Sequence, residues 1–326
     1  MQLFLPVFMI TLGILGCSQD EPRKVPQTGT EKSLPQMPAS SLQIPVFDAP
    51  RAFAFLTAQT TFGPRNPNSA GHRDCLEYLT TSLRGYADKV RLQEFTHIGY
   101  DGERLPLTNI IASFRPEIRE RILLCAHWDT RPRAEHDENR NRRNEPILGA
   151  NDGASGVAVL LAIAANMKQY PPPLGVDIVL LDGEDYGKEG DQERYLLGSR
   201  FFAQNKPPDY VPRFGVLLDM VGDKYLELPK EKHSLRFAPD IVDLIWNTAR
   251  DLGFPQFVHD TGEEILDDHV PLNEAGIKTV DLIDFNYPDQ TNRFWHSHQD
   301  TPEHCSPESL GAVGTVLTHV VYTQKP

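Results

Sequence analysis

The sequence contains little cysteine. Only four cysteines occur in 326 residues, at Cys17, Cys75, Cys125 and Cys305. Small secreted scaffolds that depend on disulfides use cysteine far more densely. A chain of this length, with 40% hydrophobic residues, must instead be stabilised by the packing of an apolar core, and one large domain is the first expectation.

Basic residues are also in short supply. The chain has 32 Lys and Arg against 45 Asp and Glu, a formal net charge of −13. Such a charge repels the phosphate backbone, which argues against nucleic acid as a partner. A partner with a positive charge or a free amine is more natural.

Long apolar runs are absent except near the N-terminus. Residues 3–16 are almost wholly apolar and carry no charge. Fourteen residues of helix extend roughly 21 Å, which is too short for a bilayer core of about 30 Å. The run is the right length for the apolar region of a secretory signal, although Met1-Gln2 lacks the usual basic residue.

This apolar run ends in Ile14-Leu15-Gly16-Cys17, which resembles the lipobox of bacterial lipoproteins. The resemblance implies that residues 1–17 contain a signal peptide and that Cys17 is acylated. The protein would then be exported and anchored to a membrane, on the periplasmic or the cell-surface side. An ordinary cleaved signal with a chance cysteine is the alternative, and it also predicts export.

The segment that follows is polar and rich in proline. Its six prolines lie between Ser18 and the end of the segment, at positions 22, 26, 35, 38, 45 and 50. A composition of this kind buries little apolar surface. We therefore expect residues 18–50 to form a disordered tether and residues 51–326 to form a single domain.

Two kinds of strand are expected in this domain. Residues 90–95 alternate between apolar and polar, and residues 107–112 read as a second strand. Four further runs, at 122–126, 176–181, 214–218 and 277–283, are almost continuously apolar. Strands that are buried on both faces have this pattern.

Helical patterns lie between the apolar strands. Residues 73–83, 154–167 and 240–252 have helical periodicity, and the last helix is indicated by Ser306 as N-cap and Pro307 at its first position. Strands that alternate with helices predict an α/β fold, a three-layer sandwich whose central sheet is mixed and mostly parallel.

Potential metal ligands follow the expected strands at their carboxyl ends. They are His127, Asp152, Glu184, Asp185, Asp219 and His296. Ligands bind at this edge in open α/β sheets, so residues far apart in sequence are expected to converge there. Two histidines with several carboxylates form a ligand set suited to zinc.

Each of these residues also has an ordinary explanation. A single histidine after a strand is commonly a hydrogen-bonded core residue. Asp152, two residues before Ala154, would be read on its own as a helix N-cap. Because so many such groups fall at one sheet edge, we favour a metal site.

Six segments are recognisable together. They are His127-Trp128-Asp129-Thr130-Arg131-Pro132, Gly149-Ala150-Asn151-Asp152-Gly153-Ala154-Ser155-Gly156, Leu181-Asp182-Gly183-Glu184-Asp185-Tyr186-Gly187, Leu217-Leu218-Asp219-Met220, Asp267-Asp268-His269 and Phe294-Trp295-His296. They resemble the glutaminyl-peptide cyclotransferases (glutaminyl cyclases) of the animal and bacteroidete type, which share their fold with the zinc aminopeptidases. The likeness runs from about residue 53 to residue 322.

The resemblance implies a zinc site with one zinc ion per chain, held by Asp152, Asp185 and His296. Glu184 would be the general base and acid. This division of the acidic pair agrees with backbone geometry, because consecutive side chains point apart in an extended chain. Asp219 and Asp267 would form a network that orients Glu184.

The implied reaction converts the N-terminal glutamine of a peptide or protein to pyroglutamate with release of ammonia. The substrate already contains its nucleophile, the α-amine, and its electrophile, the γ-amide carbon, so the enzyme has to fold the side chain back and hold it. Zinc would polarise the γ-carbonyl oxygen. Glu184 would pass a proton to the departing ammonia, for which a raised pKa is needed.

The substrate pocket would be walled by Trp295. Two positions depart from the family pattern: Asp281 stands where some members have histidine, and Tyr195 stands where a tryptophan is expected after the acidic pair. Both substitutions are expected to change the shape of the pocket. The densely charged segment 131–145 is interpreted as a solvated surface insertion near the pocket mouth.

Two other functions remain open at this point. His127 and Asp219 match the ligands of a second metal in the aminopeptidases, so a two-zinc aminopeptidase that hydrolyses N-terminal residues is the main alternative. A metal-binding module without catalysis is less favoured, because Glu184 stands beside a full ligand set. Zinc stoichiometry separates the first two.

Overall fold

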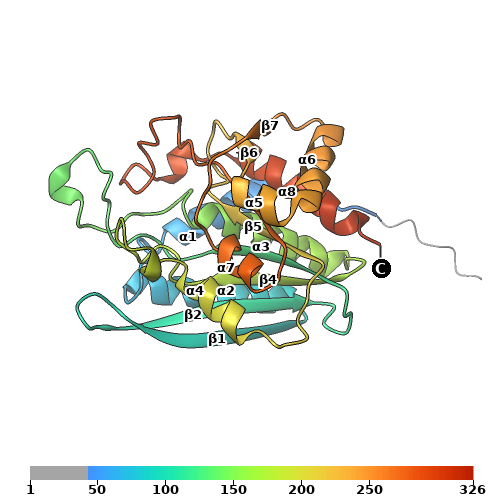
Figure 1. Ribbon diagram of the computed structural model, residues 1–326, viewed down its shortest axis with the longest axis horizontal. Coiled ribbons are helices and arrows are strands. Elements are labelled where there is room, and N and C mark those ends of the chain that lie inside the picture. The colour runs from blue at the N-terminus through green and yellow to red at the C-terminus, as the bar shows by residue number, and fades with distance from the viewer. Residues whose placement is uncertain (1–42, 326) are drawn as a thin grey trace, which may run out of the picture. The chain divides into compact units, whose positions relative to one another are not determined.

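The computed structural model describes residues 43–325 (Figure 1). Its main sheet has six strands, which lie in the order β1-β2-β4-β3-β5-β8. The strands are β1 (Lys89–Ile98), β2 (Arg104–Phe114), β3 (Arg121–His127), β4 (Gly175–Leu181), β5 (Phe214–Asp219) and β8 (Thr279–Ile283). A second, two-stranded sheet joins β6 (Leu228–Lys230) to β7 (Phe257–Thr261).

The helices of the described chain connect these strands. The longer ones are α1 (Ala49–Thr60), α2 (Ala70–Tyr86), α3 (Ala154–Gln169), α4 (Leu197–Asn205), α6 (Pro239–Leu252) and α8 (Pro307–Thr323). The short ones are α5 (Lys232–Phe237), α7 (His269–Glu274) and the 3-10 turns η1 (Arg140–Arg142), η2 (Gln192–Arg194) and η3 (Pro302–His304).

Strand direction in the main sheet is mixed and mostly parallel, as the sequence predicts. The long hairpin of β1 and β2 is antiparallel, and β2 runs antiparallel to β4. The pairs β4/β3, β3/β5 and β5/β8 are all parallel. The alternating pattern of β1 fits its position at the edge of the sheet, where one face is exposed.

Both faces of the sheet are covered, which explains the continuous apolar runs. On β3, Ile122 and Leu124 belong to the larger core, to which α1, α2, α3, α6 and α8 contribute. Leu123 and Cys125 belong to a smaller core on the opposite face, with Phe202 of α4 among its residues. Successive strand residues point to opposite faces, so the fold has three layers.

The body begins earlier than the sequence indicates. Residues 18–42 of the predicted tether lie outside the described residues, but residues 43–50 do not. Phe47 is buried and packs against Gly314 of α8, and α1 begins at Ala49 after its N-cap Asp48. The prediction of a tether up to Pro50 is therefore wrong for this last part, because one aromatic residue anchors a proline-bounded segment on the core.

The predicted signal peptide and Cys17 also lie outside the described residues. Among the helices of residues 43–325, none is both long enough and apolar enough to cross a bilayer. Cys75, Cys125 and Cys305 are buried and free. Cys125 is part of the smaller core, as expected for a cysteine that acts as a small hydrophobic residue.

Candidate metal centre and active site

The acidic residues and histidines singled out from the sequence do converge at the carboxyl edge of the parallel strands. His127 and Asp219 are the last residues of β3 and β5. Glu184 and Asp185 follow β4, and His296 lies in the loop after β8. Positioning by the ends of parallel strands thus brings together residues that are far apart in the sequence.

Two groups of potential ligands lie at this edge, and they share Asp152. One ligand atom each from Asp152, Asp185 and His296 lies within 4.8 Å of the others. The same is true of His127, Asp152 and Asp219. We call these the His296 group and the His127 group.

The His296 group has the character of a cation site. His296 Nε2 lies 3.6 Å from Asp152 Oδ2 and 3.3 Å from Asp185 Oδ1. Asp152 Oδ2 and Asp185 Oδ2 are both buried without a hydrogen-bond partner in the protein. Buried carboxylate oxygens are normally paired or bound to a metal, so these residues fit a divalent cation.

Asp152 does not cap helix α3. The N-cap of α3 is Gly153, with φ +102°, and no side chain bonds to the free amides there. A Cβ at Gly153 would lie 2.5 Å from the carbonyl oxygen of Asp129, so the tight turn requires glycine. The carboxylate of Asp152 is therefore free to act as a ligand.

A buried aspartate holds the Asp152 loop in place. Asp300 accepts hydrogen bonds from the backbone N–H groups of Asn151, at 2.7 Å, and Asp152, at 3.1 Å. The hydroxyl of Tyr287 donates to Asp300 at 3.0 Å. Asp300 thus orients a candidate ligand through its backbone, which is a role typical of residues behind a metal centre.

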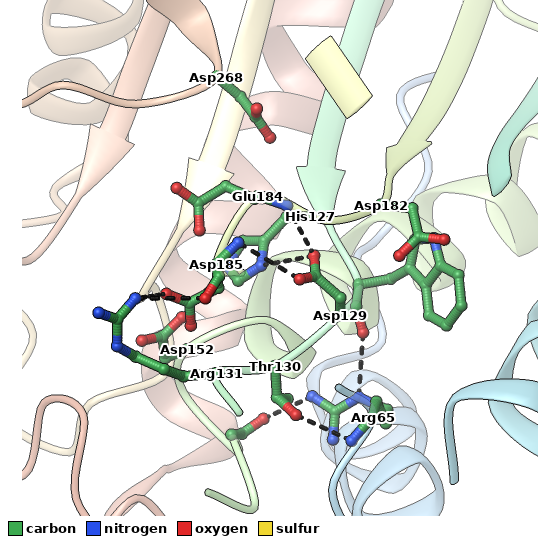
Figure 2. A network of polar contacts seen from close by, with 12 residues as sticks. Arg65, His127, Asp129, Thr130, Arg131, Asp152, Asp182, Glu184, Asp185 and Asp268 are labelled. Carbon is green, nitrogen blue, oxygen red and sulfur yellow. Dashed lines mark hydrogen bonds and ion pairs between the residues drawn. The ribbon is translucent and has the colours of Figure 1, made fainter. Parts of the chain in front are cut away.

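A second buried aspartate holds the acidic pair. The carboxylate of Asp129 accepts from the backbone N–H groups of Glu184, at 3.1 Å, and Asp185, at 3.3 Å. Figure 2 shows that the carboxylate of Asp185 lies beside Arg131 and Asp152, whereas that of Glu184 points elsewhere. The two acids therefore have different surroundings, as the sequence predicts.

Burial and neighbouring charges give these groups different proton affinities. Burial raises the pKa of Glu184 well above its usual value, and the charge of Asp185 raises it further. Burial would also raise the pKa of Asp185, but His296 and Arg131 hold it below the usual range. Burial lowers the pKa of His296 to about 4. Glu184 can thus hold a proton, while His296 is neutral at pH 7 and can donate its lone pair to a metal.

A small cavity opens beside the His296 group. Its volume is about 80 Å³, and its walls combine apolar side chains with the candidate ligands. The lining residues are Asp152, Glu184, Asp185, Tyr195, Asp219, Ile265, Leu266, Asp267, Ile283, Phe285, Trp295 and His296. A small cavity in which several polar groups converge beside apolar and aromatic walls is typical of a small-substrate site.

Asp281 does not line this cavity, contrary to the prediction. It is fully buried on β8, and it forms a cluster of ionisable groups with Asp267 and His269. Its Oδ2 lies 3.6 Å from Nδ1 of His269. Asp281 and Ile283 point to the same face of β8, but Asp281 lies two residues before the end of the strand and is therefore below the cavity, whereas Ile283 at the strand end lines it.

Three further residues support the site in ways that the sequence does not predict. Asp129, Asp300 and Arg131 were given no role, yet Asp129 and Asp300 hold the loops of the candidate ligands, and Arg131 contacts Asp185 directly at 2.8 Å. Asp129 lies two residues after His127 and is fully buried. An acid in a motif at a strand end was a usable signal for Asp129, but no local pattern predicts the partners of Asp300.

Known proteins with similar sequences and structures carry two kinds of name. A glutaminyl-peptide cyclotransferase-like protein from Bos taurus is 24% identical over 281 residues, which cover 78% of this chain and 70% of the relative. The crystal structure of a Bacteroides thetaiotaomicron glutaminyl cyclase bound to N-acetylhistamine matches with a TM-score of 0.83 and 41% identity, over 87% of this chain and 100% of that one.

The other kind of name is that of a peptidase. A leucine aminopeptidase precursor from Bacteroides thetaiotaomicron also matches with a TM-score of 0.83, at 42% identity, over 87% of this chain and 100% of that one. Residues 109–321 match the family described as Peptidase family M28. Since this match spans more than half of the chain and includes every strand from β3 to β8, the chain belongs to peptidase family M28.

Proposed function

We propose that this protein is a zinc-dependent glutaminyl-peptide cyclotransferase with one zinc ion per chain. The observation that carries the proposal is a pair of buried oxygens without hydrogen-bond partners, Asp152 Oδ2 and Asp185 Oδ2. They lie beside His296, which is neutral at pH 7, and beside the cavity that Glu184 lines. Similarity to named glutaminyl cyclases supports the same reaction.

The substrates that we propose are peptides or proteins with an N-terminal glutamine. Asp152, Asp185 and His296 would hold the zinc, which when bound supplies a Lewis acid for the γ-carbonyl of that glutamine. The cavity of about 80 Å³ has room for little more than a folded side chain. Trp295, Tyr195 and Phe285 line it, and with a substrate bound these aromatic walls would exclude water, which favours attack by the α-amine over hydrolysis.

Glu184 is the proton carrier in this proposal. Its carboxylate would accept a proton from the α-amine of the substrate and deliver it to the leaving nitrogen, so that ammonia departs as the ring closes. Burial and Asp185 raise its pKa, which suits a group that must both take and give a proton near neutral pH. Asp219 and Asp267, which line the same cavity, would orient it.

A two-zinc aminopeptidase is the second candidate, because the His127 group offers a further set of ligands. Within this group, however, Nε2 of His127 lies 3.1 Å from Asp219 Oδ1 and 3.3 Å from Asp152 Oδ1. The shorter of these contacts, to Asp219, is a hydrogen bond between the imidazole and the carboxylate itself. This arrangement supports one zinc rather than two.

The deciding experiment uses the purified chain loaded with zinc. Zinc content is measured first, and the protein is then incubated with a glutaminyl peptide and, separately, with a leucyl reporter substrate. Cyclisation predicts one zinc per chain, release of ammonia and loss of 17 Da from the peptide. Two zinc ions with hydrolysis of the leucyl reporter would contradict the proposal. Glu184→Gln is the matched control for activity that does not belong to this site.

We also propose that the protein is exported and anchored to a membrane through a lipid on Cys17. The apolar run that ends in Ile14-Leu15-Gly16-Cys17 supports this. Mass spectrometry of the protein purified from membranes is expected to find an acylated N-terminal cysteine, and Cys17→Ser is expected to abolish that modification. An unmodified, soluble parent chain would contradict it.

A further inference from the structure

The segment from Arg131 to Asp137 does not behave as the solvated insertion that its charge suggests. Arg131 is 1% exposed and Ala134 is fully buried. The exposed part of the insertion begins only after Asp137 and includes η1, which projects from the body (Figure 1). We call residues 131–137 the mouth segment.

Arg131 holds one oxygen of Asp185 and leaves the other free. Its Nη1 donates to Asp185 Oδ1 at 2.8 Å and to the backbone oxygen of Asp185 at 3.2 Å (Figure 2). Oδ2 of the same carboxylate has no partner. The guanidinium therefore restrains the rotation of the carboxylate, whose Oδ1 also lies 3.3 Å from Nε2 of His296.

The remaining donors of Arg131 reach the wall of the cavity. Nη2 donates to the hydroxyl of Tyr195 at 2.7 Å, and the guanidinium carbon lies 5.1 Å from the centre of the Tyr195 ring. Nε and Nη2 donate to Glu135 at 2.5 Å and 3.0 Å. All five N–H donors of an arginine are thus used, and a lysine offers only three donors without the planar fork.

The rest of the mouth segment contacts the other side of the site. The backbone N–H of His136 donates to the backbone oxygen of His296 at 3.2 Å. The ring of His136 packs edge-on against Trp295, with centroids 4.7 Å apart. Asp137 Oδ2 accepts from His298 Nδ1 at 2.7 Å. The segment therefore contacts two of the three candidate zinc ligands and two of the three aromatic residues that line the cavity.

We propose that Arg131 is a positioning residue that orients Asp185 for the metal and couples the metal centre to Tyr195 in the substrate wall. This inference rests on the proposed zinc site. It adds that Arg131 connects the proposed ligand Asp185 to Tyr195 in the pocket wall. Residues behind a metal ligand typically contribute 10- to 100-fold to metal affinity. The fork geometry of Arg131 is expected to contribute in that range.

The first test measures zinc affinity by competition with a chromophoric chelator, which requires no activity. Arg131→Lys keeps the charge but not the fork, and it is expected to weaken zinc binding by about 10- to 100-fold. Arg133→Lys is the matched control. Arg133 also bonds to Glu135, at 3.2 Å, but contacts neither ligand, so zinc affinity should change by less than about fivefold.

The second test separates the contact of Arg131 with Asp185 from its contact with Tyr195. With zinc at saturation, Tyr195→Phe should raise KM for a glutaminyl peptide and leave zinc affinity and kcat nearly unchanged, because it removes only the hydroxyl that Arg131 holds. Arg131→Lys should raise KM as well and also lower zinc affinity. If Arg131 served only in folding, Arg131→Lys would lower thermal stability but would change neither zinc affinity nor KM.

An Arg131→Lys protein that unfolds cooperatively and binds zinc within about fivefold of the parent would overturn the proposal. If that variant does not fold, Glu135→Gln decides. Glu135 is partly exposed and aligns the fork from the other side, so its loss should weaken zinc binding about tenfold, and unchanged affinity would overturn the inference. A parent that binds zinc but releases no ammonia would contradict the proposed reaction only.

Discussion

The His296 group and the His127 group share Asp152 but differ in how their polar atoms are satisfied. In the His296 group, Asp152 Oδ2 and Asp185 Oδ2 are buried without partners. In the His127 group, Nε2 of the histidine lies 3.1 Å from Asp219 Oδ1. A buried polar atom without a partner is costly. In the first group two carboxylate oxygens would be satisfied by a cation, whereas in the second group the imidazole bonds to Asp219 directly, although its own Nδ1 is buried without a partner.

The two histidines differ in charge as well. Burial lowers the pKa of His296 to about 4. Burial acts in the same direction on His127, but Asp219, together with the nearby carboxylates of Asp129 and Asp152, more than offsets it and raises the pKa of His127 well above the usual value. His127 is thus expected to carry a proton at pH 7. The imidazolium supplies the positive charge that a second metal would otherwise bring.

Replacing each histidine by alanine gives the largest expected contrast. His296→Ala removes a proposed ligand, so zinc affinity should fall by more than about 100-fold and activity should be lost. His127→Ala should keep one zinc per chain and lose about 1–3 kcal/mol of stability, because Asp219 loses its buried partner. Zinc titration and urea unfolding measure both variants. If His127→Ala also released the metal, the two groups would be assigned wrongly.

Glu184→Gln separates proton transfer from metal binding inside the cavity. Zinc affinity should stay close to that of the parent, since Asp185 and not Glu184 is the proposed ligand. Turnover should fall by roughly 10²- to 10⁴-fold, the usual contribution of a positioned acid or base. Steady-state kinetics at saturating zinc, together with the zinc content of the variant, check this. Loss of the metal from Glu184→Gln would mean that the acidic pair is assigned in reverse.

The residues that could be predicted from the sequence are those placed by regular elements. Apolar runs and helical periodicity located the parallel strands, and a ligand at a strand end, such as His127 or Asp219, follows from the topology. These positions depend only on the hydrophobic periodicity of the strands and helices and on the edge of the sheet at which the parallel strands end. The six motifs added the pairing of Asp152 with His296, which periodicity cannot supply.

The residues that could not be predicted depend on contacts between loops. Arg131 stands in a segment of mixed charge, and only the fold reveals that its five donors meet Asp185, Glu135 and Tyr195. Asp281 is predicted to shape the pocket, but its position inside β8 places it in a buried cluster with Asp267 and His269. The local composition of a segment indicates only how exposed its residues are on average. The roles of Arg131 and Asp281 depend instead on individual contacts with residues that are distant in the sequence.

Asp267 is another buried carboxyl group with an oxygen that lacks a hydrogen-bond partner. Such a group should affect how stability depends on pH. Burial, with the charges of Asp219 and Asp268, raises its pKa to about 8. A raised carboxyl pKa means that the folded state binds the proton more tightly. Its contribution to stability is therefore complete below pH 4 and is lost as the pH rises toward 8.

We expect the metal-free protein to lose a few kcal/mol between pH 6 and pH 9 from this source. Asp267→Asn cannot ionise, and its amide oxygen can still accept the backbone N–H of Asp268. Its unfolding free energy should therefore change less over the same range. Urea unfolding with a chelator present, at both pH values, makes the comparison. An equal pH slope in parent and variant would contradict this assignment.

Glu231 is the opposite case, a buried carboxylate whose oxygens are fully used. It accepts from the backbone N–H groups of His233, Ser234 and Ile265 and lies 3.1 Å from Nε2 of His269. Burial would raise its pKa, but the hydrogen bond and charge of His269 and the backbone donors lower it to about 2. Its stabilisation is present above the unfolded value near pH 4.5 and is lost as the pH falls toward 2.

Glu231→Gln is therefore expected to cost about 1–3 kcal/mol at pH 7 and progressively less as the pH approaches 2. Zinc affinity should not change, because Glu231 supports the start of α5 and contacts no proposed ligand. Glu263→Gln is the control: this exposed acid lies 3.9 Å from Lys232, and its loss should cost less than about 1 kcal/mol. A cost for Glu231→Gln that stays constant from pH 7 to pH 3 would mean that its amide binds as well as the carboxylate, and the contrast with Asp267 would then not rest on charge.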